Sequence, residues 1–172
     1  MQILFRMRYR LVKINKLSGY EASLYSIYLE DEQRTLFDRF LEENKNSFKS
    51  ELNNILVRLN TIGHDTGAIE DFFKLREGKP GDGVSALFDI PKSNLRLYCI
   101  RYGSLIVILG GGGFKPKSIR ALQEDKKLED ENSLMRQISL DIRKRMDDKE
   151  ISFTDDYKDF EGDLNFNDED DE

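Results

Sequence analysis

The stretch LYCIRYGSLIVILGGGGFKPKS, residues 97–118, decides how the fold is interpreted. Two apolar runs meet at Tyr102-Gly103, and the second run ends in four consecutive glycines followed by two lysines that flank a proline. Apolar runs separated by a glycine turn are typical of a β-hairpin. The run VSALFDIP, residues 84–91, precedes this hairpin after a linker too short for a helical crossover, so we expect three antiparallel strands in a meander.

The segments around this meander predict two further strands and three helices. Residues 9–15 and 22–30 alternate apolar and polar side chains, as strands do. Residues 31–44, 47–63 and 117–146 carry apolar side chains at helical spacing. We therefore expect an α+β fold: a small antiparallel sheet with an N-terminal helical hairpin and a C-terminal helix packed on it.

The helix ends also carry signals. Asp31 and Glu32 suit the start of the first helix, because acidic side chains are favourable near a helix N-terminus. Ser47 is the expected N-cap of the second helix and Gly63 its expected C-cap. The long C-terminal helix has one apolar face, formed by Leu134, Ile138, Ile142 and Met146.

The charge is distributed unevenly between two regions, residues 1–150 and an acidic C-terminal tail at residues 151–172. The whole chain carries a net charge of −6, but the tail alone holds ten acids and one base, which leaves a mildly basic body. The tail also contains aromatic residues, and two interpretations stay open. It is either a solvated, disordered terminus, or a segment that mimics a nucleic-acid strand and covers a basic face of the sheet.

Composition excludes several classes of function. Cys99 is the only cysteine, which rules out an internal disulfide and favours a cytoplasmic location. No apolar run approaches the roughly 20 residues that a membrane helix needs, and we expect no signal peptide and no membrane contact. His64 is the only histidine, so neither a zinc site nor a Ser-His-Asp triad is expected. A phosphate-binding P-loop is excluded because Phe114 follows Gly113 where that motif needs lysine.

Alternation along residues 95–102 divides the strand into two faces. Leu95, Leu97 and Cys99 form the face expected to pack under helices. The opposite face carries an arginine and two tyrosines, which suit an open surface, because guanidinium clamps phosphate and tyrosine stacks on bases. The four glycines either let a ligand approach the backbone or form a bulge. The residues expected on and beside the open surface are Arg96, Tyr98, Ile100, Tyr102, Lys115, Lys117 and Arg120.

The stretch LRLYCIRYGSLIVILGGGGFKPK, residues 95–117, resembles the central strands of RelE/ParE-superfamily toxins, in particular their phage-derived HigB-like branch. The upstream order is similar too, with a strand, two helices and the link FFKLREG at residues 72–78, so that the resemblance covers about residues 20–125. Lys-Pro-Lys and four glycines replace the tighter turn and paired lysines of the family, and no C-terminal His or Tyr matches the one that serves some members.

The resemblance implies a RelE-like, microbial-ribonuclease-like fold and the toxin of a type II toxin–antitoxin module. Such a toxin is a metal-independent, cofactor-free endoribonuclease that cleaves mRNA on the ribosome and is neutralised by a cognate antitoxin, here a helix-turn-helix protein. Arg96, Lys115 and Lys117 match the family's catalytic positions, and Arg101 and Arg120 match RNA contacts. An alternative is a non-catalytic binder of the same fold, either a ParE-like gyrase inhibitor or an accessory protein of a mobile element.

Overall fold

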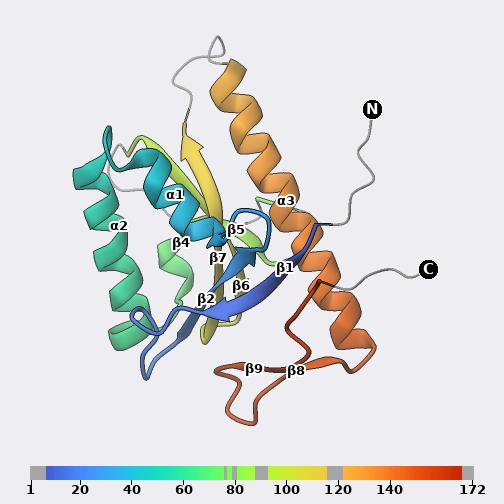
Figure 1. Cartoon of the computed structure of the whole chain (residues 1–172). Coiled ribbons are helices and arrows are strands. Elements are labelled where there is room, and N and C mark those ends of the chain that lie inside the picture. The colour runs from blue at the N-terminus through green and yellow to red at the C-terminus, as the bar shows by residue number, and fades with distance from the viewer. Residues whose placement is uncertain (1–6, 76, 79–80, 88–92, 116–121, 168–172) are drawn as a thin grey trace.

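The computed structural model describes residues 7–75, 77–78, 81–87, 93–115 and 122–167, which form a central sheet with helices on both faces (Figure 1). The sheet order is β1-β2-β7-β6-β5-β4, and β3 pairs with β2 outside this path. The strands are β1 (Tyr9–Lys13), β2 (Ser23–Leu29), β3 (Arg34–Thr35), β4 (Phe73–Lys74), β5 (Val84–Leu87), β6 (Leu95–Tyr102) and β7 (Ile106–Phe114). The helices are α1 (Leu36–Asn44), α2 (Lys49–Thr61) and α3 (Leu122–Asp147), with short helical turns at Ile62–Thr66 and Glu70–Phe72.

The prediction of an α+β fold is confirmed, and the sheet is mostly rather than wholly antiparallel. Strands β5, β6 and β7 form the expected antiparallel meander, and β1 pairs antiparallel with β2. Strand β2 runs parallel to β7, with Ser23 opposite Ile106 and Ser26 opposite Leu109. This parallel pair joins the N-terminal strands to the meander and makes one continuous sheet.

The buried Ser26 lies at the point where the pairing of β2 with β7 ends. The Ser26 hydroxyl donates to the Leu109 carbonyl at 2.7 Å and accepts from the Phe37 backbone N–H at 3.2 Å. Phe37 lies in the first turn of α1, so this hydroxyl holds the start of the helix against the sheet. Helix α1 consequently lies against β7, close to its glycine-rich half.

Three of the predicted helix ends are wrong by one to a few residues. Helix α1 begins at Leu36, not at Asp31, because Thr35 is the N-cap and accepts from the Asp38 N–H at 2.9 Å. Helix α2 has Phe48 rather than Ser47 at its N-cap position. At its C-terminus the chain continues past the predicted cap, Gly63, into a π-type turn at Ile62–Thr66. The glycine that ends this turn with a positive φ is Gly67, at 78°.

Each face of the sheet packs a separate hydrophobic core. Leu95, Leu97 and Cys99 face α1 and α2, as the alternation predicts. Tyr98 and Ile100 face α3 and lie in the second core. The expectation of an open face is therefore wrong, because α3 places apolar side chains over it; these are Leu128, Met135, Ile138 and Ile142.

The four glycines of β7 let α3 lie close to the strand. A Cβ atom at Gly111 would lie 2.4 Å from Glu131 Oε1, and one at Gly112 would lie 1.8 Å from the Arg96 carbonyl. Side chains at these positions are sterically excluded, by the helix in the first case and by the neighbouring strand in the second. The register also shifts between Leu97 and Cys99, so the bulge interpretation is confirmed. The neighbour that approaches the glycines is helix α3 and not a ligand.

Residues 151–167 of the acidic segment are a packed part of the fold. They form the hairpin of β8 (Ile151–Phe153) and β9 (Phe160–Gly162) and then run along the edge strand β1. The Leu11 N–H donates to the Leu164 carbonyl at 3.0 Å, and the Phe166 N–H donates to the Tyr9 carbonyl at 2.7 Å. Ile151, Phe160 and Phe166 are buried in the same core as α3, so the disordered interpretation is wrong for this stretch.

Candidate functional site

The structure brings Arg96 and Lys115 together at one end of the β6–β7 pair. Arg96 lies opposite Gly113, and the Lys115 N–H donates to the Asn94 carbonyl at 2.7 Å. Because side chains alternate along a strand, the register places Arg96 and Lys115 on the same face of the sheet. Lys117 and Arg120, the other two expected positive residues, lie outside the described residues.

A carboxylate from α2 fixes the start of β6, and with it the position of Arg96. Glu51 Oε1 accepts from the Asn94 N–H at 3.0 Å, and Glu51 Oε2 accepts from the Leu95 N–H at 2.8 Å. Backbone donors that precede a strand would otherwise need solvent or another partner. These two hydrogen bonds hold the backbone immediately before Arg96, and they fix the register in which β6 enters the sheet.

The guanidinium of Arg96 is partly buried beneath α3. Its Nη1 lies 3.8 Å from Glu77 Oε1, and its side chain is 21% exposed. Its Nε is buried and has no hydrogen-bond partner among the described residues. The Asn132 side chain of α3 donates to the Glu77 carbonyl at 2.8 Å, which ties the helix to this cluster. Arg96 is thus held by Glu77 and the Tyr98 hydroxyl, and its Nε is the donor that an oxyanion could still satisfy.

The tyrosines expected to stack on bases are inaccessible in this arrangement. Tyr98 is 4% exposed, and burial raises its pKa, with the neighbouring Arg96 acting in the opposite direction. Tyr102 packs its ring against Phe153 and Phe160 at centroid distances of 5.9 and 5.3 Å, and burial raises its pKa as well. Both rings pack in the core of the folded protein, so a stacking role would require this face to open.

Arg101 lies on the other face of the sheet, away from Arg96. Its Nε and Nη2 donate to the Ala68 carbonyl at 2.8 and 2.6 Å, and its guanidinium lies 5.5 Å from the centre of the Phe73 ring. These contacts tie β6 to the loop after α2. The geometry gives Arg101 a structural role and does not bring it to the Arg96–Lys115 end.

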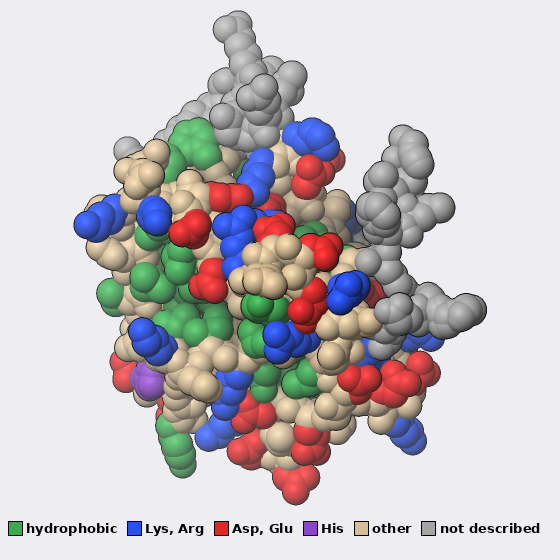
Figure 2. Space-filling model, in the orientation of Figure 1, with side chains coloured by type: hydrophobic (Ala, Val, Ile, Leu, Met, Phe, Trp, Pro, Cys, Tyr) green, Lys and Arg blue, Asp and Glu red, His purple; other side chains and the backbone are tan. Residues whose placement is uncertain are grey.

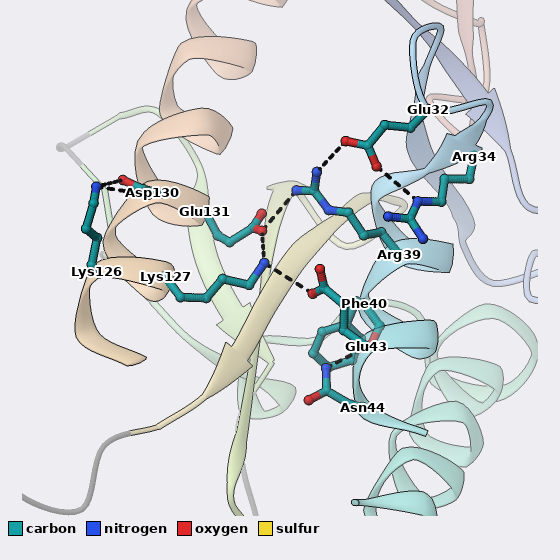
Figure 3. A network of polar contacts seen from close by, with 10 residues as sticks. All are labelled: Glu32, Arg34, Arg39, Phe40, Glu43, Asn44, Lys126, Lys127, Asp130 and Glu131. Atoms are coloured by element: carbon teal, nitrogen blue, oxygen red, sulfur yellow. Dashed lines mark hydrogen bonds and ion pairs between the residues drawn. The ribbon is translucent and has the colours of Figure 1, made fainter. Parts of the chain in front are cut away.

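A network of charged side chains links α3 to α1 next to the glycines (Figure 3). Glu131 Oε2 accepts from Arg39 Nη2 at 2.9 Å and from Lys127 Nζ at 2.7 Å. Lys127 also pairs with Glu43 of α1 at 3.1 Å, and Arg39 with Glu32 at 3.0 Å. Burial lowers the pKa of Lys127, but hydrogen bonds and charge from Glu131 and Glu43 outweigh it, so the net pKa is raised.

Sequence reasoning missed this network because its members look like ordinary surface residues. Lys127 and Glu131 are four apart on α3, which is the usual spacing of an exposed helical ion pair. Glu131 is nevertheless only 4% exposed. The signal that would have identified it is the glycine run of β7, since a strand without side chains leaves room for a carboxylate.

Two other concave surfaces lie apart from Arg96. A groove of about 600 Å³ between α1 and α2 has an apolar floor and a charged rim, and Figure 2 shows exposed hydrophobic side chains there. A cleft of about 690 Å³ runs between α3 and the C-terminal segment and includes Tyr9, whose hydroxyl donates to Asp141 at 2.8 Å. The apolar residues of the groove are Leu41, Leu52 and Leu56.

The described residues offer neither a metal centre nor a membrane-spanning helix. These residues contain no group of three or more His, Cys, Asp or Glu side chains arranged to hold a metal ion. His64 lies in the exposed turn after α2, and its Nε2 is 3.4 Å from the Lys16 carbonyl oxygen. No helix within the described part of the chain is long and apolar enough to cross a membrane.

Comparisons of the chain with known protein families, with curated proteins and with solved structures find no match.

Proposed function

We propose that the protein is the toxin of a type II toxin–antitoxin module and acts on mRNA through the end of the sheet that carries Arg96 and Lys115. The observation that supports this proposal is the backbone register, which sets Arg96 opposite Gly113 and Lys115 opposite Asn94, so that both residues belong to the same end of the β6–β7 pair. Further support comes from the element order, in which a strand, two helices and an antiparallel meander follow one another. We take α1 and α2 as the helical hairpin of a RelE-like fold.

The proposed chemistry uses side chains and no metal. The 2′-oxygen of RNA bonds to the adjacent phosphorus as the P–O5′ bond breaks, which leaves a 2′,3′-cyclic phosphate and a 5′-hydroxyl, and Arg96 stabilises the negative charge that develops on the phosphoryl oxygens. The neutral amine of Lys115 or Lys117 accepts the 2′-hydroxyl proton, and the departing 5′-oxygen takes a proton from water. None of these groups is a strong base, so the ribosome is expected to supply much of the orientation.

Binding without cleavage is the second candidate, and a specific observation favours it. Arg96 is paired with Glu77, and Tyr98 is buried beneath α3, so the folded protein offers no ready stacking platform. A ParE-like gyrase inhibitor or an accessory protein of a mobile element would need only a docking surface. In either case the proposed partners include a cognate helix-turn-helix antitoxin, and the proposed location is the cytoplasm.

Inducible expression in a bacterial host separates these candidates. We expect the wild-type chain to arrest growth and produce new mRNA 5′ ends, and Arg96→Ala and Lys115→Ala to lower the cleavage rate about 10²–10³-fold. Lys126→Ala is the matched control, because Lys126 is an exposed lysine of α3 whose partner is Asp130. Cleavage that is unchanged in both site variants would refute the assignment. Growth arrest without cleavage would favour the binding protein.

A further inference from the structure

The two halves of α3 are held to the protein by different kinds of contact. The C-terminal half buries Ile138 and Ile142 completely, and Arg145 donates to the Asp163 and Asn165 carbonyls at 2.9 and 2.7 Å. Residues 126–132 instead make mainly polar contacts, through Lys127, Glu131 and Asn132, with Leu128 as the buried apolar side chain. The N-terminal half therefore depends on charge to stay in place.

The surface under residues 126–132 is smooth, because β7 carries glycines there. Cβ atoms built on Gly111 and Gly113 would approach Glu131 and Lys127 at 2.4 and 3.3 Å, so these side chains rest directly on the strand backbone. No side chain of β7 interlocks with the helix at these positions. Lifting this segment therefore withdraws one core side chain, Leu128, rather than an interlocked row of them.

Glu131 is the central residue of this attachment, and only one of its two carboxylate oxygens has a hydrogen-bond partner among the described residues. Its side chain is 5% exposed, and its Oε2 holds both Arg39 of α1 and Lys127 of α3. Its Oε1 is buried without a hydrogen-bond partner among the described residues. The buried pair with Arg39 is thus a connection between α1 and α3 that carries a desolvation cost, and that cost is relieved when the helix lifts.

We propose that residues 126–132 of α3 form a cover over the Arg96 cluster, held closed by the Arg39–Glu131 ion pair and opened by single-stranded RNA. This inference rests on the proposed function, since Arg96 and its partner Gly113 lie beneath the cover. Lifting Glu131 removes one carboxylate from Arg39 and from Lys127, which keep Glu32 and Glu43 as their remaining acidic partners. RNA phosphates then replace Glu131 as the anion, and the RNA binds the open state more tightly than the closed one.

Hydrogen exchange tests the cover without reference to activity. We expect Glu131→Gln to speed amide exchange in residues 126–132 at least about tenfold, with residues 138–146 unchanged, because it removes the charge that holds Arg39. Asp130→Asn is the matched control. It removes one negative charge from the adjacent residue, whose partner is the exposed Lys126, and should change exchange less than about twofold.

Gly111→Ala opens the cover without altering any charge on α3. Its Cβ would displace Glu131, so exchange in residues 126–132 should rise as in Glu131→Gln. Exchange that rises equally in Asp130→Asn, or in none of the variants, or uniformly along α3, would overturn the cover.

RNA binding is measured separately, by fluorescence anisotropy of a labelled single-stranded RNA at about 0.15 M salt. We expect Glu131→Gln to bind at least about fivefold more tightly than Asp130→Asn. Local opening without any gain in RNA affinity would refute RNA as the ligand that opens the cover. The proposed function is tested separately, by the cleavage rates of Arg96→Ala and Lys115→Ala.

Discussion

Truncating the Phe160 ring tests whether the acidic C-terminal segment holds the fold together. Phe160 is 5% exposed and packs against Tyr25, Tyr102 and Phe153 at centroid distances of 5.2, 5.3 and 5.6 Å. Burial of a phenylalanine side chain is worth about 1.5–3 kcal/mol, and each aromatic pair adds about 0.5–1.5 kcal/mol. We therefore expect Phe160→Ala to lower the free energy of unfolding by about 3–5 kcal/mol, the usual range for a buried phenylalanine.

Urea unfolding monitored by circular dichroism measures this loss, with an unchanged slope as the sign of a cooperative two-state transition. Tyr157→Ala is the control, because Tyr157 lies in the same hairpin but is 63% exposed, and it should change stability by less than about 0.5 kcal/mol. A loss below about 1 kcal/mol for Phe160→Ala would refute the argument. It would mean that β8 and β9 detach from the domain without cost.

Two further predictions concern groups whose pKa is shifted by burial. Burial raises the pKa of the Cys99 thiol to about 12, so iodoacetamide at pH 8 should label Cys99 only as fast as the protein unfolds; labelling faster than global unfolding would contradict this packing. Burial also raises the pKa of Tyr25 from 10.0 to about 12. The folded state then holds the phenol proton more tightly than the unfolded state, so this stabilisation is complete below pH 10 and is lost as the pH rises through 12. The stability difference between wild type and Tyr25→Phe should fall by about 2 kcal/mol between pH 9 and pH 12, and a difference independent of pH would refute it.

The meander and the strand faces could be predicted from sequence because local patterns determine them. Leu95, Leu97 and Cys99 alternate with polar residues, and that period of two assigns one face to a core wherever the strand lies in the sheet. The start of α1 was harder to predict. Asp31 and Glu32 are favourable near any helix start, but the hydrogen bond that Thr35 accepts from the Asp38 N–H decides where the helix begins.

The covered face could not be predicted, because its cause is not local. A strand that carries Arg96, Tyr98 and Ile100 has the same pattern whether solvent or a helix lies above it. The choice is made by Met135 and Ile138, about 40 residues later, which fit against the glycines and the β6 side chains. The C-terminal segment was misjudged for a related reason. Its acids dominate its composition, while a few aromatic residues at irregular spacing anchor it to the core.

The position of the acidic hairpin bears on what neutralises the positive end of the sheet. The β8–β9 hairpin packs on Tyr102, whereas Arg96 lies six residues earlier on β6, a separation of about 20 Å at ~3.3 Å per residue. At physiological ionic strength the Debye length is about 8 Å, so the exposed acids of the hairpin act on Arg96 only weakly. The interpretation that the acidic segment shields the basic face like a nucleic-acid strand therefore does not fit the acids of the hairpin, and the acids of residues 168–172 lie outside the described residues. The carboxylates near Arg96 and Lys127 are those of Glu77, Glu43 and Glu131, and two of these three come from the loop before β5 and from α1. Opening α3 thus removes Glu131 but leaves Glu77 beside Arg96, and RNA must still compete with that carboxylate for the guanidinium.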